Sequence, residues 1–308
     1  MSTQLKSSAE CESLWDYVAA TRPGLEEALS AHLPAASPQI GTLFNEALRY
    51  ALFPGGKRLR PVLTMLGAEL VGGRPEDVLR AAVAVEYIHT SSLIFDDLPC
   101  MDDAAERRGR TALHARYGEG LAILVALALM NASYGLVFSN VRINMEHALA
   151  AHAELVEGIG ARGMVAGQSV DLTSANLESD RADFERLRNL KTSALIRMAL
   201  RLGAILSGAN DVQLGVIARY AELLGDAYQT SDDLLDMQED LSLIEAAAPP
   251  RLLPRRATFA LERGAGDAIL RIAALTSEAK YTLVSEFGAT STVNLLSELA
   301  DYVVARAA

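Results

Sequence analysis

The sequence Asp96-Asp97-Leu98-Pro99-Cys100-Met101-Asp102-Asp103 places four carboxylates within eight residues, in the middle of otherwise apolar sequence. The segment before it, residues 87–95, is predicted to be a buried helix. Burying unpaired carboxylates is costly, and because no lysine or arginine follows before Arg107, a bound cation is expected among them. Mg²⁺ is the natural candidate, since it takes oxygen ligands and commonly holds phosphates in its remaining positions. For this stretch alone, a solvated acidic turn between helices is the alternative.

A second acidic cluster lies far downstream, in a predicted helix over residues 212–240 that contains Asp232, Asp233 and Asp236. Asp232 and Asp236 are four residues apart and share one helix face, where like charges repel each other. In an otherwise apolar helix this arrangement makes sense if a metal ion lies over that face. We therefore expect the two acidic helices to face each other across a cavity.

The composition favours a helical protein with a large core. Half of the 308 residues are apolar and only 6% are aromatic, with alanine and leucine abundant. A net charge of −11 without a basic tract argues against nucleic-acid binding. The two cysteines, Cys11 and Cys100, support neither a disulfide framework nor a zinc site, and a reducing, cytoplasmic location fits best. Residues 1–11 resemble neither a signal peptide nor a transit peptide.

Helix-period apolar patterns cover most of the chain, which we expect to form one domain over residues 1–308. The predicted helices cover residues 1–20 (loosely held), 24–33, 40–52, 61–72, 75–96, 120–140, 146–172, 184–206 and 212–240, with two or three more after residue 257. Residues 241–256, rich in alanine and proline, are predicted to be a flexible lid loop.

The uncharged stretch over residues 120–140 is long enough to span a bilayer. It also contains Asn131 and Ser133, and charged residues flank it closely on both sides. A buried helix at the centre of a helical protein is therefore the preferred interpretation, with a membrane span as the alternative.

Three polar segments are candidate anion or ligand sites. Gly55-Gly56-Lys57-Arg58-Leu59-Arg60-Pro61 breaks the chain and opens a helix, where Lys57 and Arg60 share one face near an anion-binding helix N-terminus. Arg107 and Arg108 suit bidentate phosphate recognition but point apart, so they serve two different anions. Glycines around Gln168 indicate either tight helix packing or room for a ligand beside it. A solvated charged turn is the alternative for Lys57 and Arg60 alone.

Taken in order and spacing, these segments closely resemble the motifs of the trans-isoprenyl diphosphate synthases, the short-chain polyprenyl synthases. The matching segments are Gly-Gly-Lys-Arg-Leu-Arg-Pro at 55–61, DDxxxxD at 96–102, Arg-Arg-Gly at 107–109, Gly-Gln-x-x-Asp-Leu at 167–172, Lys-Thr at 191–192 and Gln-x-x-Asp-Asp-x-x-Asp at 229–236. Each motif alone is moderately specific, whereas the ordered set is highly specific and covers nearly the whole chain.

The resemblance implies an all-α fold of the isoprenoid-synthase type, with about ten main helices around a central cavity, and a homodimer. It implies that about three Mg²⁺ ions are bound by Asp96, Asp97, Asp102, Asp232, Asp233 and Asp236. The allylic diphosphate (dimethylallyl, geranyl or farnesyl) is expected to contact Arg107, Lys191, Thr192 and Gln229. Isopentenyl diphosphate is expected to contact Lys57, Arg60, His89 and Arg108. Neither a nucleic-acid partner nor a membrane span is expected.

The expected product follows from helix geometry. Ser91 and Ser92 lie five and four residues before Asp96, one turn deeper on the same helix face. In the family, a bulky aromatic residue here closes the pocket at the farnesyl stage. Because both residues are small in this chain, we expect geranylgeranyl diphosphate (C20), with Met65, Met130 or another deeper residue as the pocket floor.

The chain departs from the family pattern in several places. Ala126-Leu127 replaces the usual Gly-Asp, and Phe95 replaces the usual histidine before the first aspartate pair. Ala246 and Arg256 stand where two lid lysines are usual, which puts allylic-substrate binding in doubt unless Arg251 or Arg255 compensates. These departures keep three alternatives open: a farnesyl diphosphate (C15) synthase, a non-catalytic modulating subunit of another synthase, and a class I terpene cyclase. The intact aspartate motifs argue against the subunit, and Lys57, Arg60 and His89 argue against the cyclase.

Overall fold

The structure is a computed structural model that describes residues 5–37, 39, 42–53, 55–139, 144–173, 181–245 and 263–307. Within these ranges it describes no side chains at 171, 173, 181–191, 236–245 and 307. The chain forms two compact units: Met1–Ile159 with Met198–Asn210, here the first unit, and Gly160–Arg197 with Asp211–Ala308, here the second unit. The single domain expected from the sequence stays a prediction.

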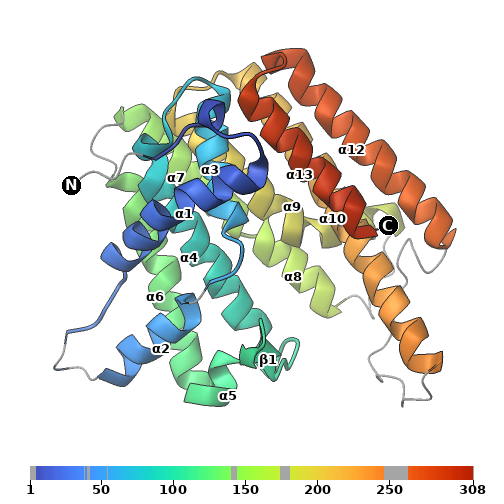
Figure 1. The fold of residues 1–308 in the computed structure, drawn as a ribbon. Helices are drawn as coiled ribbons and strands as arrows, with labels where there is room; N and C mark the ends of the chain where they lie inside the picture. Colours follow the sequence, from blue (N-terminus) through green and yellow to red (C-terminus); the bar gives the residue numbers. More distant parts are fainter. Residues whose placement is uncertain are drawn as a thin grey trace. The chain divides into compact units, whose positions relative to one another are not determined.

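The described elements are almost all helical, which confirms the all-α prediction (Figure 1). In the first unit they are η1 Ser8–Glu10, α1 Leu14–Ala31, α2 Thr42–Leu52, α3 Leu59–Leu70, η3 Pro75–Val78, α4 Leu79–Asp96, the hairpin β1 Glu106–Arg107 and β2 Arg110–Thr111, α5 Leu113–Tyr117, α6 Glu119–Phe138 and α7 Met145–Ile159. In the second unit they are α8 Met164–Thr173, α10 Asp211–Glu245, α12 Ala265–Phe287 and α13 Ser291–Ala307. Helix α9, Arg181–Leu206, begins in the second unit and ends in the first.

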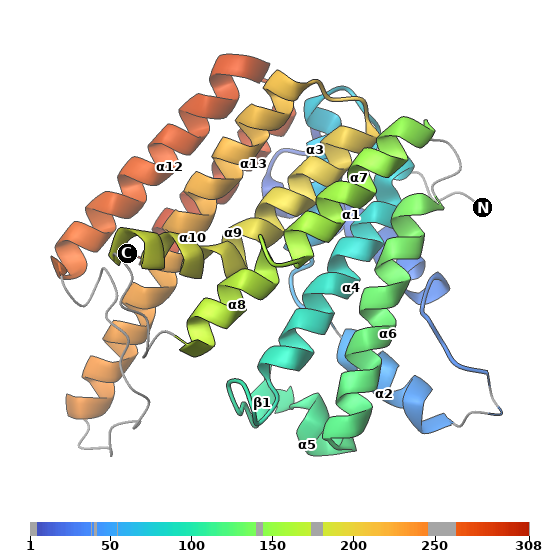
Figure 2. The ribbon, with the colours of Figure 1, turned by 180° about the vertical axis from the view of Figure 1, so that it is seen from behind.

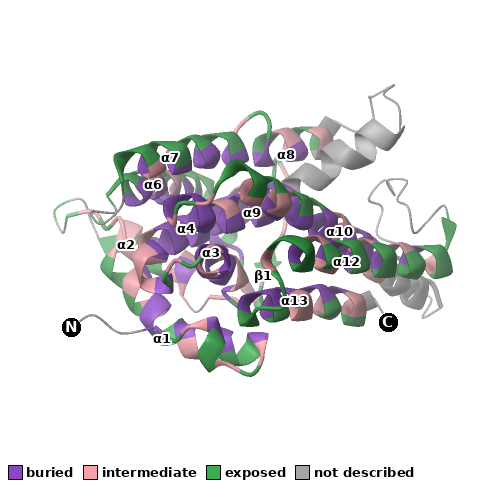
Figure 3. Ribbon diagram, turned by 90° about the horizontal axis from the view of Figure 1, so that it is seen from above, coloured by how far each residue is buried: buried purple, intermediate pink, exposed green. Residues whose placement is uncertain are grey.

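Helix α4 is the core element of the first unit. It packs against α1, α2, α3 and α6, and it is buried over most of its length (Figure 3). The sequence of α4 explains this position, because its own apolar and small residues occur on every face of the helix and do not form a single stripe. Close packing around α4 therefore holds the helix, and with it the acidic motif at its C-terminal end, in one position.

The N-terminal segment differs from the loosely held helix predicted over residues 1–20. One helix, α1, runs through Pro23 and joins the end of the first predicted segment, 1–20, to most of the second, 24–33. The preceding backbone is anchored as well: Leu5 N–H donates to Glu76 at 3.0 Å, and Ser8 N–H donates to Glu69 at 2.8 Å. The buried Tyr17 hydroxyl also donates to Glu69, at 2.8 Å. From Leu5 onward, the segment is held by hydrogen bonds to α3 and η3.

Two further helix boundaries differ from the sequence prediction. The single helix predicted over 146–172 is divided into α7 and α8 by a turn at 160–163, where two of four residues are glycine. Helix α10 continues to Glu245, so the first five residues of the predicted lid, 241–245, are helical. The rest of the predicted lid, with Ala246, Arg251, Arg255 and Arg256, lies outside the described residues.

Helix α6 corresponds to the uncharged stretch that was predicted to be buried, but only one face of it is covered. Ile123, Leu124, Leu127 and Phe138 are exposed on it, while Val125 and Leu129 are buried against the first unit. By length and composition alone, two described helices could cross a membrane: Pro75–Asp96 and Glu119–Phe138. In the most apolar 18-residue stretch of each, 78% of the first and 39% of the second is buried. The expectation of a buried helix was wrong, because the described helices that pack on α6 (α2, α4, α5 and α7) leave the face with Ile123, Leu124 and Leu127 exposed.

Helices α10, α12 and α13 pack side by side in the second unit (Figure 2). The hydroxyl of Tyr220 on α10, fully buried, donates to the carbonyl of Leu296 on α13 at 2.8 Å. Gly225 on α10 lets α9 come close, because a Cβ there would lie 2.5 Å from the Ser193 Cβ. This close approach lies one turn before Gln229, so it also brings the polar side chains that follow on α10 close to α9.

Candidate active site

The first acidic motif forms at the C-terminal end of α4. Asp96 and Asp97 are 8% and 4% exposed, whereas Asp102 and Asp103 are exposed to solvent. The loop between the two pairs folds back, because the Asp102 N–H donates to the Asp96 carbonyl at 2.9 Å. The partial negative charge of the α4 C-terminus adds to that of the carboxylates. The motif thus concentrates negative charge at one end of a buried helix.

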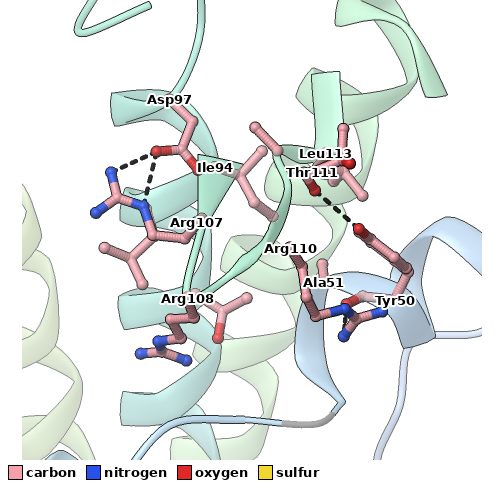
Figure 4. Close-up of a pocket in the computed structure, with 12 residues that line it drawn as sticks. Tyr50, Ala51, Ile94, Asp97, Arg107, Arg108, Arg110, Thr111 and Leu113 are labelled. Atoms are coloured by element: carbon pink, nitrogen blue, oxygen red, sulfur yellow. Dashed lines mark hydrogen bonds and ion pairs between the residues drawn. The ribbon is translucent and has the colours of Figure 1, made fainter. Parts of the chain in front are cut away.

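Arg107, on β1, lies against this motif. Its Nε donates to Asp97 Oδ1 at 2.8 Å, and its Nη2 donates to the same oxygen (Figure 4). The hydrogen bond with Asp97 raises the pKa of Arg107 above its usual value, and the charges of Asp97, Asp96 and Asp102 act in the same direction. One predicted diphosphate ligand is therefore paired with one predicted metal ligand.

A second group in the first unit brings together three of the residues predicted to bind isopentenyl diphosphate. The His89 Nε2 atom lies 3.2 Å from Arg60 Nη1 and 3.4 Å from Arg108 Nη2. Burial, followed by the charge of Arg60, lowers the pKa of His89 well below its usual value. Guanidinium groups only donate, so Nε2 is the acceptor and the imidazole is neutral. For Lys57, the fourth of these residues, the structure places Nζ 5.4 Å from the centroid of the Trp15 ring.

The two glycines before Lys57 are explained by close approach of arginine side chains. A Cβ on Gly56 would lie 2.8 Å from the Arg108 guanidinium carbon, and one on Gly55 would lie 1.9 Å from that of Arg58. Both guanidinium groups therefore pack directly on the backbone of the loop. The Arg60–His89–Arg108 group carries two fixed positive charges around a neutral acceptor, which suits a diphosphate.

In the second unit, the structure links Thr192, Gln229 and Asp233. The Thr192 hydroxyl donates to Gln229 Oε1 at 3.4 Å, and Gln229 Nε2 donates to Asp233 Oδ1 at 3.2 Å. Asp233 is only 7% exposed. A side-chain amide thus connects a predicted diphosphate contact on α9 with a predicted metal ligand on α10.

Asp232 has a partner that sequence reasoning missed. Arg306, in the last turn of α13, donates from Nη2 to Asp232 Oδ1 at 2.6 Å. The Arg306 guanidinium also lies over the Tyr228 ring, 4.4 Å from its centroid. No sequence signal pairs these residues, because Arg306 is a lone arginine 74 positions beyond Asp232 and outside every motif.

The remaining predicted site residues are placed less completely. The side chains of Lys191 and Asp236 lie outside the described part of the chain. Gln168 is half-buried on α8, in the second unit. The two acidic motifs belong to different units, so their expected arrangement across a cavity stays a prediction.

The acidic residues fit Mg²⁺ that is completed by a diphosphate. Among the residues whose side chains are described, no three His, Cys, Asp or Glu side chains converge into a ready-made metal cage. Mg²⁺ does not need one, since it typically binds one or two carboxylates and fills its octahedron with phosphate oxygens and water. Asp96 with Asp97, and Asp232 with Asp233, each offer such a pair.

A cavity of about 60 Å³ lies in the first unit between α2, α4 and the hairpin (Figure 4). Tyr50, Ile94, Asp97, Arg107 and Leu113 are among its lining residues. Pockets that take drug-sized ligands enclose roughly 300 Å³ or more, so this cavity does not hold a prenyl chain. Asp97 and Arg107 line it, so it adjoins the first acidic motif.

Comparison with known proteins identifies the family. The polyprenyl synthetase model matches residues 41–245. The chain is 41% identical over 239 residues to an Arabidopsis thaliana geranylgeranyl pyrophosphate synthase 11, chloroplastic, covering 76% of this chain and 67% of that protein. It is 36% identical over 292 residues to the chloroplastic geranylgeranyl pyrophosphate synthase of Capsicum annuum, covering 94% and 78%.

Solved structures of synthases share the fold. An FPP/GFPP synthase from Zymomonas mobilis matches with a TM-score of 0.80 at 30% identity, covering 97% of this chain and all of that one. A geranyltransferase from Legionella pneumophila matches with a TM-score of 0.81 at 26% identity, covering 98% and 99%. The chain therefore belongs to the polyprenyl synthetase family and is a trans-prenyltransferase of the geranylgeranyl or farnesyl diphosphate synthase type.

Proposed function

We propose that this protein condenses isopentenyl diphosphate with allylic diphosphates in an Mg²⁺-dependent reaction and releases geranylgeranyl diphosphate (C20). One observation carries the proposal: α4 presents both His89, of the arginine–histidine group, and Asp96, of the first acidic motif. Seven residues separate them, so they share a face and lie about 10 Å apart along the helix. That spacing suits two diphosphates bound side by side, with isopentenyl diphosphate at His89 and the allylic diphosphate at Asp96.

The proposed chemistry uses bound charge instead of an enzyme nucleophile. The C–O bond of the allylic diphosphate breaks, and Mg²⁺ supplies charge that stabilises the leaving diphosphate. Arg107, Lys191, Thr192 and Gln229 orient the same diphosphate and add donors to it. The C=C bond of isopentenyl diphosphate, held by Lys57, Arg60, His89 and Arg108, then attacks the allylic cation. A proton is lost from the adduct, and the released pyrophosphate accepts it.

The proposed C20 product rests on Ser91 and Ser92. Both are buried, and both side chains are small compared with an aromatic one. Ser91 donates to the Ala126 carbonyl on α6 at 2.9 Å, and Ser92 donates to the His89 carbonyl on its own helix at 2.9 Å. The names of the plant relatives support C20, whereas those of the bacterial structures name C15 and other lengths, so a farnesyl diphosphate synthase is the alternative.

A product assay tests the proposal. The purified protein is incubated with Mg²⁺, isopentenyl diphosphate and dimethylallyl, geranyl or farnesyl diphosphate, and the dephosphorylated products are sized. We expect mainly C20 alcohols from each starter. Mainly C15 alcohols would replace the proposal with the farnesyl alternative. An inactive protein that gains activity only with a partner synthase would revive the modulating-subunit alternative.

Replacing either Ser91 or Ser92 by phenylalanine is expected to shift the main product from C20 to C15. The added ring blocks the path along α4 one turn below Asp96, where the tail of the growing chain extends. Ser91→Ala and Ser92→Ala are the controls, because they remove the same hydroxyls without adding bulk and should keep C20. Retention of C20 in both phenylalanine variants would place the pocket elsewhere.

We also propose that the protein is a cytoplasmic homodimer. The exposed apolar residues of α6, Ile123, Leu124 and Leu127, support a second copy as their partner, since a face of this kind commonly marks an interface. Sedimentation of the purified protein tests the assembly, and a mass of one chain would contradict it.

A further inference from the structure

The contact between Arg306 and Asp232 is the feature that the proposed reaction does not use. Helix α13 packs along α10 (Figure 1). Its last turn places the Arg306 guanidinium on Asp232. Tyr228 lies one turn before Asp232 on α10, and its ring supports the other side of the guanidinium. Arg306 is thus held by two residues of one helix face, which is more than a chance surface ion pair provides.

We propose that Arg306 occupies Asp232 in the metal-free enzyme and competes there with the divalent cation. Resting on the proposed Mg²⁺-dependent function, this inference adds that the last turn of α13 sets the metal concentration at which the second acidic motif fills. Arg306 lies outside the residues matched by the family model, which end at residue 245. The proposed competition therefore depends on a residue of α13, outside the matched region.

The geometry explains why the two cations compete. Arg306 holds Oδ1 of Asp232. A divalent ion on the same carboxylate would lie roughly 5 Å from the fixed positive charge of Arg306, and the two cations repel each other at that distance. Asp233 is 7% exposed and is held by Gln229, whereas the Asp232 side chain is 36% exposed. Asp232 is therefore the more accessible ligand, and Arg306 lies directly on it.

The exposure of the Arg306 side chain makes its release inexpensive. Its side chain is 22% exposed, so water replaces the lost contacts when it leaves. A metal ion with a diphosphate displaces the guanidinium without disturbing the α10–α13 contact at Tyr220.

Direct metal binding tests the inference without an activity readout. Mn²⁺ is titrated into wild type and R306Q, in the absence and presence of inorganic pyrophosphate, and bound Mn²⁺ is measured by water-proton relaxation. We expect R306Q to bind Mn²⁺ about 5- to 10-fold more tightly than wild type. K280Q is the matched control, because it removes one positive charge on α12 that pairs at the surface with Asp301 on α13. It should stay within about twofold of wild type.

The outcomes separate this inference from the function it rests on. Unchanged or weaker Mn²⁺ binding in R306Q, with normal binding in wild type, overturns the competition and leaves the proposed function in place. Absence of bound Mn²⁺ from every variant overturns both. Adding D232N to R306Q should abolish the gain, and a gain that persists would assign it to another carboxylate. Hydrogen exchange in the last turn of α13 should also rise when wild type binds Mn²⁺ and pyrophosphate, and no rise would contradict displacement.

Discussion

Replacing Asp96 by asparagine is expected to lower kcat for the condensation by about two to three orders of magnitude. The amide keeps the size of the carboxylate but removes the charge that would hold Mg²⁺ on the leaving diphosphate. Asp96 is 8% exposed at the end of α4, so no neighbouring loop substitutes for it. Steady-state kinetics at saturating Mg²⁺ and substrates measure the effect. Because the change also removes a buried charge beside Asp97, the melting temperature should stay constant or rise.

Asp103→Asn is the matched control for this prediction. Asp103 ends the same loop, and its replacement by asparagine removes the same charge, but the Asp103 side chain is exposed. Its φ of 49° is left-handed, a conformation that asparagine tolerates well. We expect kcat to change less than about threefold for Asp103→Asn, since Asp103 is exposed and is not one of the expected metal ligands. Equal losses in both variants would show that total loop charge, and not Asp96, supports the reaction.

The contacts that are easiest to derive from the sequence are those within one helix, where spacing decides position. His89 and Asp96 lie on one face of α4 because seven residues make two turns, and Gln229 and Asp233 meet because four residues make one. The expected convergence of Arg60, His89 and Arg108 is also present, although their roles stay predictions.

The contacts that the sequence did not predict join segments far apart in the chain. Arg306 reaches Asp232 across 74 residues, a distance at which helix periodicity carries no information. Helix boundaries at α7 and α8 were missed because glycine is tolerated in helices at a cost, and only packing decides whether the helix continues. The neutral state of His89 also depends on burial and on two arginines from other elements.

Arg58 was the basic residue of the 55–61 loop to which no role was assigned, and the structure places it inside the protein. It is 3% exposed, and it donates from Nη1 to Glu86 at 2.5 Å and from Nε to Glu26 at 2.9 Å. Its Nη2 also donates to the Leu52 carbonyl at 2.8 Å. Burial alone would lower the pKa of Arg58, but hydrogen bonds with Glu26 and the charge of Glu86 outweigh it and raise the pKa.

Replacing Arg58 by methionine is expected to reduce the free energy of unfolding by about 3–5 kcal/mol. The Glu86 side chain is only 2% exposed and would be left as a buried carboxylate without its cation. Denaturant unfolding measures the loss. Arg74→Met is the matched control, because the Arg74–Asp77 pair has similar distances at the surface, and its loss should cost at most about 1 kcal/mol. Similar losses in the two variants would show that burial of the Arg58 pair is not what makes it important.

The same substitution is expected to raise KM for isopentenyl diphosphate more than KM for the allylic substrate. Glu86 lies one turn before His89 on α4, so the Arg58–Glu86 pair and the Arg60–His89 contact attach the loop to the same helix at adjacent points. The double variant R58M/E86L separates anchoring from stability. It removes both charges, so most of the free energy of unfolding should return. KM for isopentenyl diphosphate should nevertheless stay high, because residue 58 has a left-handed φ of 57° that only its buried contacts maintain. A double variant with wild-type KM would mean that the loop positions Arg60 without this anchor.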